Sequence, residues 1–212
     1  MIHYYTNVRS LNDFKNGKEQ VGILRRKTPK NIDTFFKKFY KTPLSISGHI
    51  NRISAKKDIN ELLKRTVSND IKFDPFYENW LEDMSEICKF FCSFQGQEQI
   101  SFWLGSDRGC KRYHVDMVPF RLLVTYAGKG TEILPDKAAN RNAFIEGKQN
   151  NKIIKDKLAL QFSNIWDISI FRGGPRGILH RTPDAALNSN SSILMRLDDS
   201  SFIDKIIKFN HT

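Results

Sequence analysis

A histidine and an aspartate two positions apart, His114 and Asp116, open an alternating apolar run in this chain of 212 residues. A second histidine, His180, follows 66 positions after His114 in the stretch "GILHRTP". Side chains two positions apart on an extended segment share a face, so the first two can bind one ion together. Two imidazoles and one carboxylate on one side of a metal ion leave its opposite positions open, as in non-haem Fe(II) oxygenases. The three residues therefore predict a metal site, and iron suits these donors.

The same three residues have a plainer interpretation as ordinary polar groups at strand ends. His114 would then bond Asp116, and His180 would cap a strand. The context favours a metal, because "WDISIFRGGPRGILHRTP" places an apolar strand and a Gly-rich turn before His180. Cys110 leaves another alternative open, since a soft thiolate close to His114 suits zinc in a non-enzymatic, cupin-like metal-binding or metal-homeostasis protein.

The first half of the chain reads mainly helical. Apolar residues recur at helical spacing in "NIDTFFKKFYKT", "KDINELLKRTVSN" and "FDPFYENWLEDMSEICKFFCSF". The last stretch is the strongest, since Asp74 can cap it, Pro75 suits its first turn and Gly96 can end it. Cys88 and Cys92 share a face of this helix without partners of metal-site spacing, which predicts buried thiols rather than ligands.

The second half changes to the two-residue period of β-strands. Strands are predicted at "EQISFWLG", "FRLLVTYAG", "TEIL", "WDISIF", "GILHRT" and "SSILMRLD", with a helical insertion near residues 136–163. The closing stretch "FIDKIIKF" fits a strand or a short helix. Short strands joined by Gly- and Pro-containing turns favour an α+β fold, a β-barrel or β-sandwich with helices packed against it. We expect one domain over 1–212, mainly helical over 1–95, with the metal-binding β core over 96–212.

Two motifs, "HVDMVPFRLLVTYAGKGTEI" and "WDISIFRGGPRGILHRTP", together resemble the double-stranded β-helix of the 2-oxoglutarate/Fe(II) oxygenases. That resemblance implies a cupin-like or jelly-roll-like barrel with N-terminal helices packed against it. It also implies iron ligands at His114, Asp116 and His180, and 2-oxoglutarate as the cosubstrate. A closer likeness covers roughly residues 75–200, which resemble the bacterial domain-of-unknown-function family 1826. That family name carries no activity, so the expected dioxygenase, an oxidoreductase, follows from the motif and the inferred fold.

The resemblance to the oxygenases further implies a cation for the distal carboxylate of 2-oxoglutarate. Arg196 has the expected position on the strand after the second histidine, although its strand face is ambiguous because its neighbours form the cleaner apolar row. Arg121 and Arg181 are further candidates, since a guanidinium binds a carboxylate through two parallel hydrogen bonds. Tyr126 could donate a hydrogen bond to the same acid. Each arginine also has an interpretation as a surface or salt-bridging residue.

The chain carries a formal net charge of +11, which is uneven along its length. Residues 1–74 hold 16 Lys and Arg against 7 Asp and Glu, whereas residues 75–109 hold 2 against 6. The basic N-terminal part raises a third hypothesis, a nucleic-acid-modifying oxygenase, although no nucleic-acid-binding motif accompanies it. No apolar run approaches the ~18 residues of a membrane span, and the N-terminus is too polar for a signal peptide. We expect a cytoplasmic protein without a membrane partner.

Overall fold

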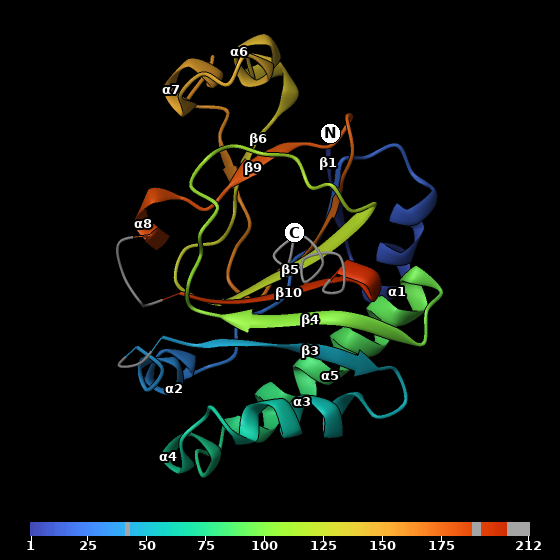
Figure 1. Cartoon of the computed structure of the whole chain (residues 1–212), viewed down its shortest axis with the longest axis vertical. Helices are drawn as coiled ribbons and strands as arrows, with labels where there is room; N and C mark the ends of the chain where they lie inside the picture. The colour runs from blue at the N-terminus through green and yellow to red at the C-terminus, as the bar shows by residue number, and fades with distance from the viewer. Residues whose placement is uncertain (41–42, 188–191, 203–212) are drawn as a thin grey trace, which may run out of the picture.

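The main sheet of the protein combines strands from both halves of the chain. The computed structural model describes residues 1–40, 43–187 and 192–202. Within these residues, seven strands pair in the order β1-β2-β8-β5-β10-β4-β3 (Figure 1). β1 and β2 are parallel, and every other neighbouring pair is antiparallel. The strands are β1 (Ile2–Tyr5), β2 (Val21–Leu24), β3 (Ser45–Asn51), β4 (Gln99–Gly105), β5 (Phe120–Ala127), β8 (Ile168–Arg172) and β10 (Ile193–Asp199).

A smaller sheet packs against one face of the main sheet. In the described part of the chain it has three strands in the order β7-β6-β9. Their bounds are β6 (Glu132–Leu134), β7 (Gln161–Phe162) and β9 (Leu179–Arg181). Ile133 of β6 lies in one buried cluster with Leu123 of β5 and Leu194 of β10. An apolar layer between the two sheets therefore holds β9, and with it His180, over the main sheet.

Helices cover the opposite face of the main sheet and extend one end of the molecule (Figure 1). The long helix α5 and its neighbours α2, α3 and α4 lie on that face, while α6 and α7 form a lobe beyond the small sheet. The helical segments are α1 (Val8–Leu11), η1 (Asn12–Asn16), α2 (Ile32–Lys37), α3 (Ala55–Lys64), α4 (Asn69–Lys72), α5 (Tyr77–Gln95), η2 (Asp136–Ala138), α6 (Arg141–Ile145), α7 (Asn150–Ile153) and α8 (Asp184–Leu187).

Helix α5 ends at Gly96, as its sequence predicts, but begins at Tyr77, so Asp74 and Pro75 precede it instead of forming its cap and first turn. Asp74 accepts a hydrogen bond from the Phe76 N–H at 2.8 Å just before the helix. Gly96 ends it in a left-handed conformation, with φ of 74°, which glycine adopts without a Cβ penalty. Its buried face carries Trp80, whose ring lies 5.9 Å from that of Tyr126 on β5. Aromatic packing of this kind fixes the helix to the sheet.

Strand β5 divides its side chains between the two faces of the main sheet, because successive side chains alternate. Leu122, Val124 and Tyr126 belong to the core beneath the helices. Leu123 belongs to the cluster between the sheets, and Arg121 lines a pocket with it. The strand therefore has an apolar face toward the helices and a mixed face toward the site.

The predicted α+β class is confirmed, and the insertion near 136–163 contains η2, α6 and α7. The division at residue 95 does not separate a helical part from a β core, because residues 1–95 also supply β1, β2 and β3. β1 and β2 are only four residues long, too short for a two-residue period to stand out. The stretch "FIDKIIKF" lies almost wholly outside the described residues.

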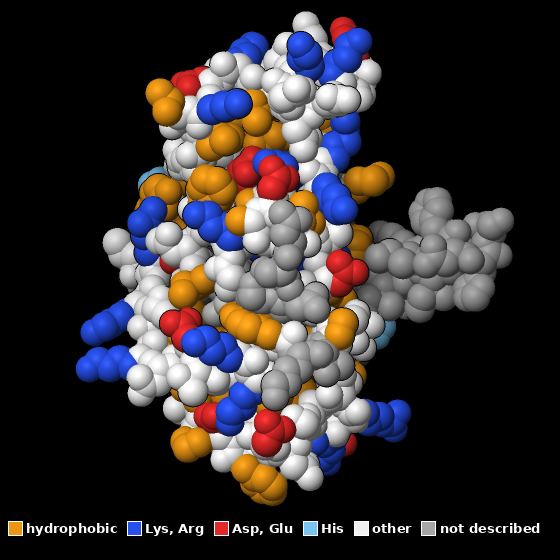
Figure 2. All heavy atoms as spheres, turned by 90° about the vertical axis from the view of Figure 1, so that its left-hand side faces the viewer, with side chains coloured by type: hydrophobic (Ala, Val, Ile, Leu, Met, Phe, Trp, Pro, Cys, Tyr) orange, Lys and Arg blue, Asp and Glu red, His pale blue; other side chains and the backbone are white. Residues whose placement is uncertain are grey.

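On the side of the molecule in Figure 2, Lys and Arg side chains are scattered among acidic and neutral ones rather than gathered in one patch. No helix in the described ranges is long and apolar enough to cross a membrane.

Candidate metal centre

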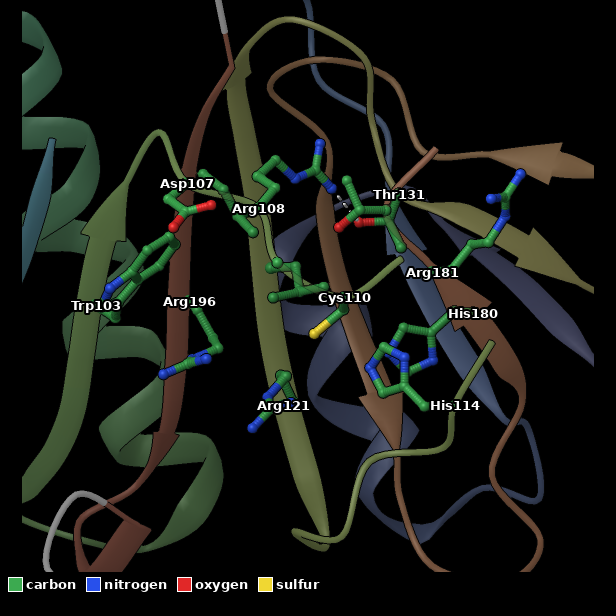
Figure 3. A pocket seen from close by; sticks show the side chains of 14 residues that line it. Trp103, Asp107, Arg108, Cys110, His114, Arg121, Thr131, His180, Arg181 and Arg196 are labelled. Atoms are coloured by element: carbon green, nitrogen blue, oxygen red, sulfur yellow. Dashed lines mark hydrogen bonds between the residues drawn. The ribbon is translucent and has the colours of Figure 1, made fainter. Parts of the chain in front are cut away.

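The backbone brings the two histidines of the predicted site together. His114 and His180 form an isolated antiparallel bridge, in which each N–H donates to the other's carbonyl at 3.0 Å. Their rings lie side by side, with centroids 4.4 Å apart (Figure 3). His180 belongs to β9, whereas His114 lies in the extended segment before β5. Because the pairing is through main-chain groups, it places both rings on one side of the small sheet.

Each imidazole is held in a tautomer that suits a metal ligand. The Nδ1 atom of His114 lies 3.1 Å from the carbonyl of Arg112, and that of His180 lies 3.1 Å from the carbonyl of Ile178. A carbonyl oxygen only accepts, so both Nδ1 atoms carry the proton. In the neutral rings the two Nε2 atoms then keep their lone pairs, which is the usual arrangement of metal-binding histidines.

Asp116 supplies the third donor, and its two oxygens have different surroundings. Its side chain is fully buried, and Oδ1 accepts a hydrogen bond from Arg121. Oδ2 has no hydrogen-bond partner among the described residues and lies 3.3 Å from Nε2 of His180. Two acceptors this close need a cation between them, either a proton or a metal ion. The ligand atoms of the three residues all lie within 4.8 Å of one another, so the donor set fits a divalent ion.

Electrostatics keep the Asp116 carboxyl ionised. Burial alone would raise its pKa, but His180, Arg121 and His114 outweigh burial and hold the pKa well below its usual range. Arg121 is in turn fixed by Asp198, which accepts from its Nε at 2.7 Å. Asp198 and Arg121 therefore form a buried chain of contacts that orients the carboxylate of Asp116.

The pocket beside this cluster contains the arginine whose strand face was ambiguous in the sequence. Arg196 pairs across the sheet with Trp103 and Leu123, so it lies on the face toward the small sheet. Its guanidinium lies 5.4 Å from the Trp103 ring and 5.2 Å from that of Phe202. Its Nε faces Asp198 at 3.1 Å, and within the described ranges its terminal nitrogens have no protein acceptor. They are free to bind an anion in the pocket.

Two other candidates do not face the pocket as free donors. Arg181 borders it, but its guanidinium points away (Figure 3). It is engaged by Glu132 at 2.8 Å and by Asp184 at 2.7 Å. Tyr126 is a correction to the expected site: it lies on the opposite face of β5, and its hydroxyl donates to Asp83 at 2.8 Å. It is five positions from Arg121, and an odd separation on a strand means opposite faces.

Cys110 lies close to the three ligands but outside the cluster. Its side chain is exposed, and a hydrogen bond with His114 lowers the pKa of the thiol. Cys88 and Cys92 are buried, as predicted. Sequence reasoning missed Asp198 and the ring of Trp103 as parts of the site. Alternation along β10 was the available signal, because Asp198 is two positions from Arg196 and shares its face.

The chain belongs to a family that has a description but no assigned activity. The model of "Protein of unknown function (DUF1826)" matches residues 6–198, which confirms the resemblance seen in the sequence. No protein of curated function matches the chain. A solved structure of a bsmA homolog from Methylobium petroleophilum PM1 is similar at 9% identity, covering 93% of this chain and 94% of that one, with a TM-score of 0.45.

A second similar structure is that of a C-terminally truncated protein from Neurospora crassa in apo form. It is 9% identical and covers 91% of this chain and 88% of that one, with a TM-score of 0.40. Likenesses this distant carry no argument about activity. The chemistry of the site must therefore be argued from its own residues.

Proposed function

We propose that the protein is a non-haem Fe(II)-dependent oxygenase that uses 2-oxoglutarate, built on a double-stranded β-helix formed by its two facing sheets. The observation that carries the proposal is the unpartnered Oδ2 of buried Asp116, which faces Nε2 of His180 at 3.3 Å. One buried carboxylate and two imidazoles suit a divalent ion with open positions.

The chain's own residues would hold the ion and keep its open side toward the pocket. The carbonyls of Arg112 and Ile178 fix the Nδ1 protons, so both histidines present Nε2. Arg121 holds the other oxygen of Asp116, which keeps Oδ2 turned toward the histidines. When bound, Fe(II) supplies the ability to activate O₂, of which one oxygen atom enters the substrate and the other enters succinate as 2-oxoglutarate loses CO₂.

Arg196 is the residue we propose for the distal carboxylate of 2-oxoglutarate. It lies on β10, the strand after the distal histidine, and lines the same pocket as His114 and His180. Its Nε lies in an ion pair with Asp198 at 3.1 Å without forming a hydrogen bond, and the rings of Trp103 and Phe202 lie close to its guanidinium, so these contacts restrict where the terminal nitrogens lie. Arg121 is less suited to this role, because both of its carboxylate partners already occupy it.

Metal binding tests the ligand set directly. The anaerobic protein is titrated with Fe(II) or Mn(II), and its unfolding is followed in urea. One ion per chain is expected, and at a hundredfold excess over its Kd it should raise the free energy of unfolding by about 2.7 kcal/mol. Asp116→Asn and His180→Ala should lose this gain, whereas His3→Ala, a change at an exposed histidine, should keep it. Full metal binding in a His114→Ala, His180→Ala double variant would exclude the site.

Cosubstrate use separates an oxygenase from a metal-binding protein without activity. With Fe(II) and O₂, succinate should form slowly from 2-oxoglutarate even without substrate, and Arg196→Met should abolish 2-oxoglutarate binding while metal binding persists. If the metal binds but 2-oxoglutarate has no effect, the cosubstrate part of the proposal is wrong. If zinc binding is lost in Cys110→Ser, the non-enzymatic zinc alternative is favoured instead.

A further inference from the structure

Arg108 is a buried arginine in the wall of the same pocket. It follows β4, the residue is 5% exposed, and it lines the pocket with His114, His180 and Arg196 (Figure 3). Arginine is rarely buried this completely without a charged partner. A charged partner is therefore expected for Arg108.

The partners of Arg108 in the described part of the chain are all neutral. Its Nη1 donates to the carbonyl of Lys129 and, at 3.4 Å, to the hydroxyl of Ser192. Its Nη2 donates to the hydroxyl of Thr131 at 3.2 Å, and its Nε is buried without any described acceptor. Among those residues no carboxylate forms an ion pair with it, and burial lowers its pKa to about 10. Arg181, by contrast, faces carboxylates from the same pocket wall.

The other arginines that line the pocket each face a carboxylate, whereas Arg108 faces none. Asp107 lines the pocket too, but among the described residues no ion pair links its carboxylate with Arg108. The carboxylates of Asp116 and Asp198 offset the guanidinium groups of Arg121 and Arg196. Arg108 has only neutral acceptors among the described residues, and a buried charge without a charged partner is strongly unfavourable.

We propose that Arg108 binds an anionic group, a carboxylate or a phosphate, of the molecule that the protein oxidises. The identity of that molecule as the oxidised substrate rests on the proposed function; the anion site itself does not. Leu123 and Leu194 line the pocket as well and provide an apolar surface for the rest of the ligand. The substrate class is therefore a small organic acid or phosphate ester, anchored at Arg108 with its reacting carbon toward His114 and His180.

The Nε–H of Arg108 gives a direct reading of this site. We record ¹H–¹⁵N spectra of the whole protein while titrating it with sodium butyrate, ethyl phosphate or neutral butyramide. Each titration is done once with Zn(II) and 2-oxoglutarate present and once without either. The signal is assigned by its absence in Arg108→Lys. We expect it to shift and saturate with one of the two anions in both forms of the protein, and not with butyramide. The anion that acts distinguishes a carboxylate from a phosphate ester.

Calorimetry with the same probes gives the size of the effect. Loss of a charge-assisted hydrogen bond should weaken anion binding in Arg108→Lys on the order of tenfold to a hundredfold. Arg65→Lys, at an exposed arginine after α3, should leave it unchanged. Arg196→Gln should lose binding of 2-oxoglutarate but keep the response of Arg108 to the anion.

Two results would overturn the inference. If no anion moves the Arg108 signal, the residue only supports the segment around Lys129 and Thr131. If 2-oxoglutarate alone moves it, with no further response to either anion, Arg108 serves the cosubstrate. If the Arg108 signal responds to an anion but the protein binds no Fe(II), the anion site is supported and the proposed oxygenase function is wrong.

Discussion

Replacing Arg121 by methionine tests whether this arginine positions the metal-binding carboxylate. Arg121 is 12% exposed, and it joins two carboxylates, those of Asp116 and Asp198, that are at most 2% exposed. Methionine keeps most of the side-chain volume and removes the charge. Breaking a buried ion pair by removing one partner costs about 3–5 kcal/mol, and we expect the metal-free variant to lose that much stability in urea.

The metal affinity of the variant separates two physical effects of opposite sign. Coulomb repulsion alone predicts tighter binding, because a positive charge next to the ion has been removed. Orientation predicts weaker binding, because Oδ2 of Asp116 is no longer held toward His180, and loss of such a supporting contact lowers metal affinity on the order of tenfold to a hundredfold. We expect orientation to dominate, since the carboxylate has no other described hydrogen bond.

The measurement is an anaerobic Mn(II) titration by calorimetry, with Arg196→Met as the matched control. That control also removes an arginine that faces Asp198, but it leaves the contact between Arg121 and Asp116 intact. Its metal affinity should stay within about threefold of the parent protein. Unchanged or tighter metal binding in Arg121→Met would refute the positioning role.

Three further outcomes are expected. Asp74→Asn should lower the free energy of unfolding by about 1 kcal/mol, because the folded protein lowers the pKa of Asp74, first of all through its hydrogen bond with Lys38. Urea titrations at several pH values should show the full difference between parent and variant above the ordinary carboxyl pKa of 3.8. The difference should vanish as the pH falls through the lowered pKa. Leu63→Ala should lower stability by about 2–5 kcal/mol in the same assay, since Leu63 is fully buried in the helical core. Iodoacetamide should label exposed Cys110 first, with the fast phase lost in Cys110→Ser, and equal labelling of the buried cysteines would contradict the packing of α5.

The grouping of the three residues of the candidate metal centre could be predicted because their signals are short in sequence or repeat a known motif. His114 and Asp116 are two positions apart, and His180 follows a turn after which the chain pairs with His114. The two-residue period of β5 also predicts that Tyr126 and Arg121 lie on opposite faces, so the sequence itself argued against placing both at the site.

The parts that could not be predicted depend on contacts between distant segments. The register of β10 with β4 and β5 decides that Arg196 lies beside Trp103, and no local pattern fixes that register. The same holds for charge pairing. No sequence pattern predicts that Arg108 is buried, and only the folded structure shows that no carboxylate among the described residues forms an ion pair with it.

Asp198 links the two halves of the site, and its replacement by asparagine should therefore affect both. Its Oδ1 accepts from Nε of Arg121 at 2.7 Å, and its Oδ2 faces Nε of Arg196 at 3.1 Å. Asparagine has nearly the same shape, but its amide nitrogen only donates, so either Arg121 loses its acceptor or Arg196 faces an N–H in place of a carboxylate oxygen.

We expect Asp198→Asn to weaken the binding of both Mn(II) and 2-oxoglutarate, each on the order of tenfold, because it removes charge and an acceptor beside both arginines. Arg196→Met should weaken only 2-oxoglutarate binding, and this contrast distinguishes a shared support from a general loss of stability. The variants are compared by calorimetry at a temperature where each is fully folded. If Asp198→Asn lowers the urea midpoint and leaves both affinities unchanged, the carboxylate stabilises the sheet without coupling metal and cosubstrate.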